Sequence, residues 1–153
     1  MYQHILVPLD GSEFAECVIP HVEAVSIGCA VVKVTLIRAI GPLHIRGGLE
    51  TRISTEEQKR IESQATESAK EYLEKVAAQL KDKGIVAGVE IVHGDVVDTL
   101  IEYASKNNVD LIIMGTHGSS GIVRWAMGSV ADKILRHSPV PVLLAAPKAC
   151  RIS

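Results

Sequence analysis

Residues 110–145 read DLIIMGTHGSSGIVRWAMGSVADKILRHSPVPVLLA and contain each kind of element from which the rest of the chain is built. An apolar run over 111–114 leads into a loop, Gly115 to Gly121, with three glycines in seven residues. An amphipathic segment from Ser129 to His137 follows, and a second apolar run spans 140–146. Short runs that are almost entirely apolar are typical of parallel strands covered on both faces. The stretch therefore predicts a strand, a loop, a helix and a second, parallel strand.

The same alternation of apolar runs and helical patterns continues toward the N-terminus. Further strands are predicted over residues 5–9, 30–40 and 86–93. Helices are predicted after Ser12, from Thr55 to Gly84, and from Asp95 to the pair Asn107-Asn108. Strands that alternate with helices form right-handed crossovers. The predicted fold class is therefore α/β, a single doubly wound, Rossmann-like domain whose five-stranded parallel sheet has helices on both faces.

Three residues mark the expected helix ends and bends. Pro20 lies inside the first helical pattern and is predicted to bend that helix, because proline removes a backbone donor. Thr55, with Gln58 three residues later, predicts a capping box at the start of a helix about 40 Å long at ~1.5 Å per residue. The hydroxyl of Ser129 suits two roles, a cap on its own helix or a donor to a phosphate oxygen.

Size and charge exclude several classes of function. A chain of 153 residues and 16.4 kDa is expected to form one domain. Its 16 Lys and Arg against 18 Asp and Glu leave a net charge of -2, so no cationic excess favours nucleic acid or an anionic membrane. One Trp, three Tyr and one Phe are too few for base-stacking surfaces. We expect neither a nucleic-acid nor a membrane partner, since no apolar run approaches the ~18 residues of a membrane span.

Cysteine and histidine usage indicates no metal site and a reducing compartment. Cys17, Cys29 and Cys150 are odd in number and contain no Cys-x-x-Cys pair, which argues against a disulfide framework and a zinc site. The N-terminus lacks a basic run followed by a long apolar run, so no targeting signal is expected. We expect a cytoplasmic protein.

The glycine-rich segment indicates phosphate binding. Glycines let backbone N–H groups approach a ligand closely, and free amides at a helix start favour an anion. A plain turn is the alternative that these residues leave open. The segment has no lysine and so is not a P-loop. The dinucleotide fingerprint is also disfavoured, because residues 9–12, LDGS, hold only one glycine after the first strand.

The spacing Gly115-x2-Gly118-x9-Gly128-Ser129 resembles the universal stress protein family. Residues 5–12, ILVPLDGS, are similar to the opening strand and loop of that family, and His93-Gly94-Asp95 is similar to its third strand-to-helix turn. The resemblance implies a nucleotide-binding domain over residues 1–147, a short tail over 148–153 and the strand order 3-2-1-4-5. Family members with the complete glycine pattern bind ATP, so the resemblance also implies ATP, or AMP or ADP, as the ligand.

The resemblance further implies a role for each site residue. The phosphates would be held by Gly115, Gly118, Gly128 and Ser129, with the amides of His117, Ser119 and Val130. Asp10 would accept hydrogen bonds from the ribose hydroxyls, although its position alone favours a turn. The backbone near Ala39 would contact the adenine edge. Pro8 and Met114 would pack around the nucleoside. Any Mg or Mn would be held mainly by the phosphates. No catalytic residue is predicted, since His117 has no partner in sequence for general-base chemistry.

In the resembling family the last strand pairs with its copy, which implies a homodimer through Val140 to Ala146. Pro139 and Pro141 bracket the start of that run, and proline is tolerated chiefly at a sheet edge. An apolar edge of this kind needs to be covered. Arg46 and Arg52, in the irregular stretch 41–54, are interpreted as solvated charges, with a lid over a triphosphate as the alternative.

We therefore interpret the sequence as that of an ATP-binding, stress-response regulator whose nucleotide state sets its loops and its choice of an unknown protein partner. One alternative is an enzyme that hydrolyses ATP slowly or performs nucleotidyl chemistry on the same fold. That chemistry would need a lysine or a histidine pair beside the α-phosphate, and only His117 is near. A flavodoxin-like electron carrier is a further alternative, but Trp125 is the only aromatic residue in the candidate loops to stack on a flavin.

Overall fold

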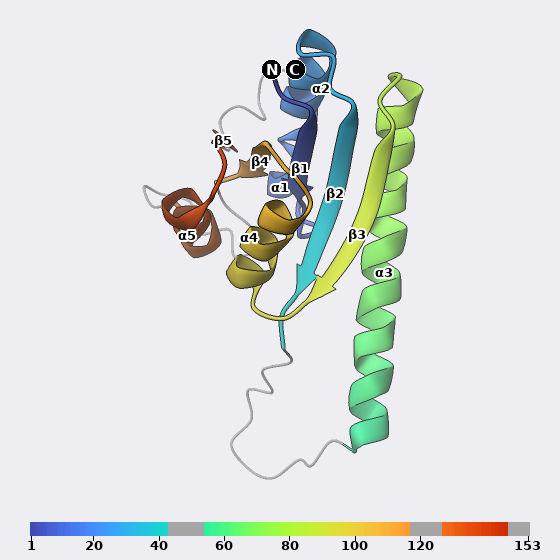
Figure 1. The fold of residues 1–153 in the computed structure, drawn as a ribbon. Helices are drawn as coiled ribbons and strands as arrows, with labels where there is room; N and C mark the ends of the chain where they lie inside the picture. The colour runs from blue at the N-terminus through green and yellow to red at the C-terminus, as the bar shows by residue number, and fades with distance from the viewer. Residues whose placement is uncertain (43–53, 117–126, 147–153) are drawn as a thin grey trace.

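The computed structural model describes residues 1–42, 54–116 and 127–146. Five parallel strands form one sheet in the order β3-β2-β1-β4-β5 (Figure 1). The strands are β1 His4–Pro8, β2 Lys33–Ile40, β3 Ala87–His93, β4 Leu111–Gly115 and β5 Val142–Ala145. The predicted fold class and strand order are confirmed.

Helices cover both faces of the sheet. They are α1 Glu13–Glu16, α2 Ile19–Gly28, α3 Thr55–Asp82, α4 Val96–Lys106 and α5 Ser129–His137. On one face, Ile5 and Val7 of β1 pack with buried residues of α1, α2 and α3. On the other face, Leu6 packs with α4 and α5. Because successive residues of a strand point to opposite faces, both of which are covered, the interior of β1 must be apolar, which explains its apolar run from Ile5.

The first helical pattern is split into two helices, so the predicted single helix bent at Pro20 is wrong. α1 ends at Glu16, and α2 begins at Ile19 with Pro20 in its first turn. The N–H groups of a first turn have no acceptor within the helix, so a proline there loses no hydrogen bond. The chain therefore starts a new helix at the proline instead of continuing through it.

The long helix α3 begins at Thr55, and its N-cap is the preceding residue, Ser54, instead of the predicted Thr55. The hydroxyl of Ser54 accepts from the N–H of Glu57 at 3.2 Å, so the capping box is not the predicted pair Thr55 and Gln58. Its end is confirmed at Gly84, which has φ +82 and donates its N–H to the Lys81 carbonyl at 2.9 Å. No helix in the described ranges is both long and apolar enough to cross a membrane.

Two predicted strands are shorter than their apolar runs. The run 30–40 becomes a strand only from Lys33, because Ala30 has φ +51 and the N–H of Val31 donates to the Ser26 carbonyl at 3.0 Å, which completes the end of α2. The run 140–146 becomes a strand only from Val142 to Ala145. Pro141 has no N–H to give, although its carbonyl accepts from Ile112.

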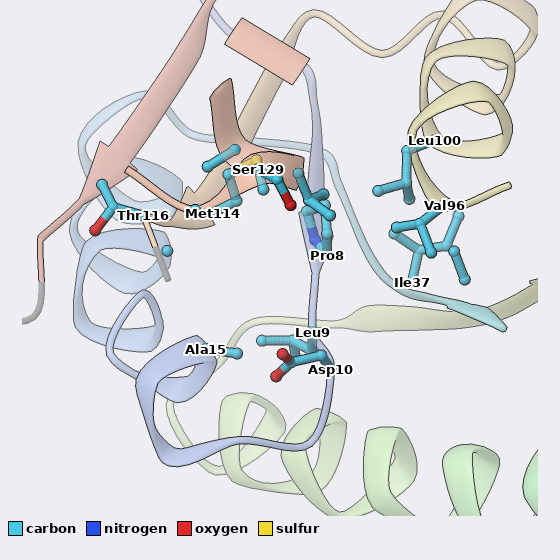
Figure 2. Close-up of a pocket in the computed structure, with 15 residues that line it drawn as sticks. Pro8, Leu9, Asp10, Ala15, Ile37, Val96, Leu100, Met114, Thr116 and Ser129 are labelled. Atoms are coloured by element: carbon cyan, nitrogen blue, oxygen red, sulfur yellow. The ribbon is translucent and has the colours of Figure 1, made fainter. Parts of the chain in front are cut away.

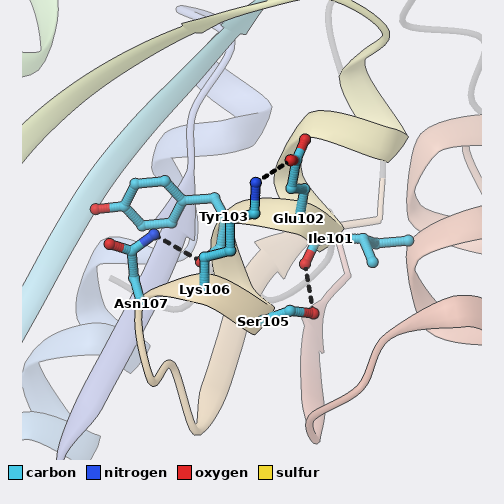
Figure 3. A network of polar contacts seen from close by, with 6 residues as sticks. All are labelled: Ile101, Glu102, Tyr103, Ser105, Lys106 and Asn107. Atoms are coloured by element: carbon cyan, nitrogen blue, oxygen red, sulfur yellow. Dashed lines mark hydrogen bonds and ion pairs between the residues drawn. The ribbon is translucent and has the colours of Figure 1, made fainter.

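A buried histidine ties β1 to the end of α4. Nδ1 of His4 lies 3.0 Å from the Asn107 carbonyl, which can only accept, so this nitrogen carries the proton. Nε2 therefore accepts from the Thr35 hydroxyl at 2.9 Å. Figure 3 shows how α4 ends here, with the Asn107 amide donating to the Tyr103 carbonyl at 2.9 Å. Burial lowers the pKa of His4 and keeps the ring neutral.

The cysteines differ from each other in their bonding. Cys29 is free and Cys17 is disulfide-bonded. The sequence analysis argued only against a disulfide framework and did not predict the bond at Cys17. An odd count and wide spacing argue against a framework of several bonds, but spacing along a chain does not determine which sulfurs meet once the chain has folded.

Candidate functional site

A cavity of about 280 Å³ opens at the carboxyl ends of β1, β2 and β4. The strand order places β1 between β2 and β4, so the chain leaves β1 in one direction and later returns on its other side. Open α/β sheets bind ligands at such a switch point, because the two diverging connections leave a crevice there. The cavity therefore lies where this topology favours a binding site.

Most of the predicted site residues line this cavity. They are Pro8, Asp10, Ala39, Met114, Gly115, Gly128, Ser129 and Val130. The predicted residues His117, Gly118 and Ser119 lie outside the described residues, as do Arg46 and Arg52. The chain thus brings together residues from β1, β2, β4 and α5 that are far apart in the sequence.

One wall of the cavity is apolar and was missed by sequence reasoning. It includes Ile37 of β2 together with Val96 and Leu100 of α4. In Figure 2 these three side chains lie on one side of Pro8, and Met114 and Ser129 lie on the other. Apolar walls with a few polar groups are typical of small-molecule sites and suit a flat ring. The only sequence signal was the i, i+4 spacing of Val96 and Leu100, which core residues share.

The start of α5 contributes the polar part of the cavity. Gly128 is the N-cap residue, with φ -58 and ψ 148, and no side chain caps the helix. The N–H of Gly128 donates to the Thr116 carbonyl at 2.7 Å, which fixes the start of α5 beside the end of β4. Ser129 and Val130 are the first helical residues, whose N–H groups have no acceptor within the helix. The positive end of α5 therefore borders the cavity.

Ser129 does not use its hydroxyl as a cap. The helix begins at Ser129 itself, after Gly128, and no side-chain hydrogen bond caps it. In Figure 2 the hydroxyl oxygen is directed toward Pro8. The cap, one of the two roles that the sequence left open for this residue, is therefore wrong; donation to a phosphate oxygen stays a prediction.

Asp10 shapes the loop that follows β1 and also lines the cavity. Its Oδ1 accepts from the backbone N–H of Ser12 at 2.9 Å and from the Ser12 hydroxyl at 2.5 Å. This is an Asx turn, the role that position alone favoured. Ser12 in turn caps α1 by accepting from Ala15 N–H at 3.1 Å. A carboxylate has about four acceptor positions, so two bonds from Ser12 are compatible with a further bond from a ligand hydroxyl.

Within residues 1–42, 54–116 and 127–146, no group of three or more His, Cys, Asp or Glu residues is placed to hold a metal ion. Among the described residues, the polar groups at the cavity are the carboxylate of Asp10, the hydroxyls of Ser129 and Thr116, and the backbone at the start of α5. This set suits a ligand with both hydroxyl donors and an anionic part.

Comparisons with known proteins identify a family. The model of the universal stress protein family matches residues 1–146. The chain is 31% identical over 159 aligned positions to universal stress protein MJ0577 of Methanocaldococcus jannaschii, covering 97% of each chain. The solved structure of MJ0577 has a TM-score of 0.82 and covers 95% of this chain and 96% of its own.

Two further solved structures share the fold at lower identity. Universal stress protein UspA from Lactobacillus plantarum has a TM-score of 0.79 at 21% identity, covering 94% of this chain and 97% of its own. A universal stress protein in complex with cAMP has a TM-score of 0.65 at 23% identity, covering 95% of this chain and 98% of its own.

Proposed function

The chain belongs to the universal stress protein family, and we propose that it is a regulatory protein that binds an adenine nucleotide, ATP or its products AMP and ADP. The observation that carries this proposal is the composition of one cavity. The uncapped positive end of α5, the Asp10 carboxylate and an apolar wall all line it. An adenine nucleotide has one matching part for each: phosphates, ribose hydroxyls and a flat base.

In the proposed complex the phosphates lie at the start of α5. The first-turn amides at Ser129 and Val130 donate to phosphate oxygens, and the helix dipole favours the negative charge. Gly115 and Gly128 let the phosphates approach the backbone closely because glycine carries no side chain. We assign the amides of His117 and Ser119, with Gly118 between them, to the same phosphates on the basis of the sequence motif.

The nucleoside occupies the rest of the cavity. Asp10 accepts from the ribose hydroxyls, since a carboxylate is an acceptor and a hydroxyl a donor. The backbone near Ala39 reads the adenine edge at the end of β2. Pro8 and Met114 pack around the nucleoside, opposite the apolar side chains of β2 and α4.

The fold itself can hold a ligand of this class. One structure with the same fold is a complex with cAMP, which supports the capacity of the architecture for an adenine nucleotide. At 23% identity that likeness speaks for the fold alone. For this chain the proposal rests on its own residues at the cavity. Any Mg²⁺ or Mn²⁺ is proposed to be held mainly by the phosphates, because these hard cations prefer oxygen ligands.

We propose regulation in preference to rapid turnover. Fast phosphoryl transfer needs a positioned water, a metal held by protein carboxylates or an arginine that stabilises the transition state. Among the described residues, the proposed site consists of backbone amides, one carboxylate, hydroxyls and apolar side chains. Nucleotide occupancy would instead set the shape of the surrounding loops and so the choice of a protein partner during a cytoplasmic stress response.

We also propose a homodimer through Val140 to Ala146. The strand order places β5 at one edge of the sheet. Its residues Val142, Leu143 and Leu144 remain partly exposed. An apolar edge strand exposes unpaired backbone groups, and pairing with the same strand of a second copy would cover both.

The proposed function is tested by the ligand that the protein carries. Purified protein is denatured, and the released small molecules are identified by chromatography and mass spectrometry. We expect an adenine nucleotide; protein that releases none and also fails to bind added ATP would contradict the proposal.

In a parallel incubation with ATP and magnesium, ATP that stays intact supports the regulator, and conversion to ADP or AMP supports the enzyme alternative.

A further inference from the structure

The loop after β1 is held from the face of the sheet that lies opposite the nucleotide cavity. Ile37 and Ala39 of β2 line that cavity, and Arg38 between them points to the other face because side chains alternate along a strand. Nη1 of Arg38 donates to the main-chain carbonyl of Asp10 at 2.5 Å. A guanidinium donor makes this a charge-assisted hydrogen bond, which is stronger than one between neutral groups.

Gly11 shows how closely Arg38 packs on the loop. Gly11 has φ +85, and a Cβ built there would lie 2.8 Å from Nη1 of Arg38. No larger residue fits beneath the guanidinium without displacing it. The backbone N–H of Leu9 donates to the Ile37 carbonyl at 2.9 Å. This backbone bond joins the end of β1 to β2, and the bond from Arg38 joins β2 to the next residue of the loop, Asp10.

A second cavity lies beside the loop on this side. Its volume is about 460 Å³, and Gly11, Arg38 and Tyr72 of α3 are among the residues that line it. The hydroxyl of Tyr72 is buried on this side of the loop. Burial raises the pKa of Tyr72, as do the nearby carboxylates of Glu16 and Asp10. Without the guanidinium, the Asp10 carbonyl would lose this donor.

We propose that Arg38 is a positioning residue that sets the direction of the Asp10 carboxylate and thereby the recognition of ribose hydroxyls. Arg38 fixes the carbonyl of Asp10, and Ser12 fixes its Oδ1, so both ends of one residue are restrained. Arg38 does not line the nucleotide cavity, so it acts through Asp10. This inference rests on the proposed function, because it assigns a ribose to the carboxylate.

The first test compares two nucleotides by isothermal titration calorimetry. ATP carries both ribose hydroxyls, and 2′,3′-dideoxyATP carries neither. Arg38→Met removes every donor and should lower ATP affinity about tenfold, the size of one hydrogen bond to a charged group, with dideoxyATP affinity unchanged. Arg38→Lys keeps a charged donor and should retain part of the preference for ATP over dideoxyATP. Asp10→Asn should lose the preference as Arg38→Met does, and Arg60→Met, on the exposed part of α3, should keep it.

Equal weakening of ATP and dideoxyATP by Arg38→Met, or no weakening of either, would overturn the inference. A purely structural role for Arg38 predicts the first of these results, because a damaged site loses affinity for both ligands. If Arg38→Met does not fold, the ratio of the two affinities in Arg38→Lys decides the matter by the same criterion.

The second test needs no nucleotide. Hydrogen exchange of the Ser12 amide, which donates to Asp10 Oδ1, is measured by NMR in the parent, Arg38→Lys, Arg38→Met and Arg60→Met proteins. Exchange should be faster in the two Arg38 variants only. If the parent binds no adenine nucleotide, the proposed function fails, and this measurement still decides whether Arg38 holds the loop. Unchanged Ser12 exchange in both Arg38 variants would refute that role.

Discussion

Ser129 begins α5 without capping it, so its hydroxyl is available for a ligand at little cost to the fold. Ser129→Ala should change the free energy of unfolding by less than about 0.5 kcal/mol, since the residue is exposed and no cap is lost. ATP affinity should fall about tenfold, because a hydrogen bond to a charged phosphate is lost. Adenosine has no phosphate, so its affinity should not change.

Calorimetric titrations with ATP and with adenosine, together with thermal unfolding, check this expectation for Ser129. Ser63→Ala is the matched control, because Ser63 is exposed on α3. Equal weakening of ATP and adenosine binding in Ser129→Ala would contradict phosphate recognition by this hydroxyl.

His4 makes stability depend on pH below neutrality. Burial holds its pKa below the ordinary value of 6.5, so between these two values the unfolded chain binds a proton that the folded chain does not. The free energy of unfolding should therefore fall as the pH decreases from about 6.5. The free energy of unfolding in urea should differ less between pH 7.5 and pH 5.5 for His4→Gln than for the parent. His137→Gln, at an exposed position, should behave as the parent, and an unchanged pH dependence in His4→Gln would refute this account.

Among single residues, the polar part of the site was more predictable than the apolar part. Gly128 and Ser129 are recognisable because their chemistry and spacing are local to one segment. Ile37 and Leu100 are apolar residues in ordinary strand and helix patterns, and sequence alone does not distinguish a cavity wall from a core. Whether such a side chain meets another side chain or a ligand depends on packing between distant elements.

The end of α2 contains a strained residue that can be relieved. Ala30 has φ +51, a conformation that costs an L-residue roughly 1–2 kcal/mol and that glycine adopts freely. Ala30→Gly should therefore stabilise the protein by about 0.5–1 kcal/mol in urea unfolding, despite the greater freedom of glycine in the unfolded chain. Ala78→Gly, the same change on the exposed face of α3, should destabilise by about 1 kcal/mol. Destabilisation of similar size in both variants would contradict the strain at Ala30.

Helices and strands were predicted well in their interiors and less well at their ends. Periodicity identifies an interior from many residues, whereas an end depends on one or two local contacts. The hydroxyls of Ser54 and Thr55 are adjacent, and the sequence does not decide which accepts the first amide. Ala30 shows the same limit, because an apolar residue next to a strand can serve instead to end the preceding helix.

The order of the whole sheet could not be derived from local pattern. Alternating strands and helices predict parallel crossovers, but a right-handed crossover can place the next strand on either side of β1. The position of β4 beside β1 depends on contacts between residues about a hundred positions apart, such as Ile5 with Leu111. The resemblance to a known family supplied the order, and the structure confirms it.

The exposed edge of β5 leads to a prediction about assembly. Light scattering at micromolar concentration should give about twice the 16.4 kDa of one chain. Ala146→Lys, at the exposed position directly after β5, should lower the dimer fraction, because a charge beside the edge opposes strand pairing. Gly88→Lys, on the opposite edge strand β3, should leave the mass unchanged. A monomeric mass for the parent would exclude dimerisation at this concentration.

The most direct test of nucleotide binding is a calorimetric titration of ATP into the parent and into Gly128→Val. Gly128 has φ -58 and ψ 148, which any residue can adopt, so the variant should fold, with a loss of about 1 kcal/mol because valine is a poor N-cap residue. Its side chain would crowd the first-turn amides of α5. We predict saturable binding of one ATP per chain in the parent and none in Gly128→Val. A parent that takes up no ATP, or a folded variant that binds ATP as tightly as the parent, would contradict the account.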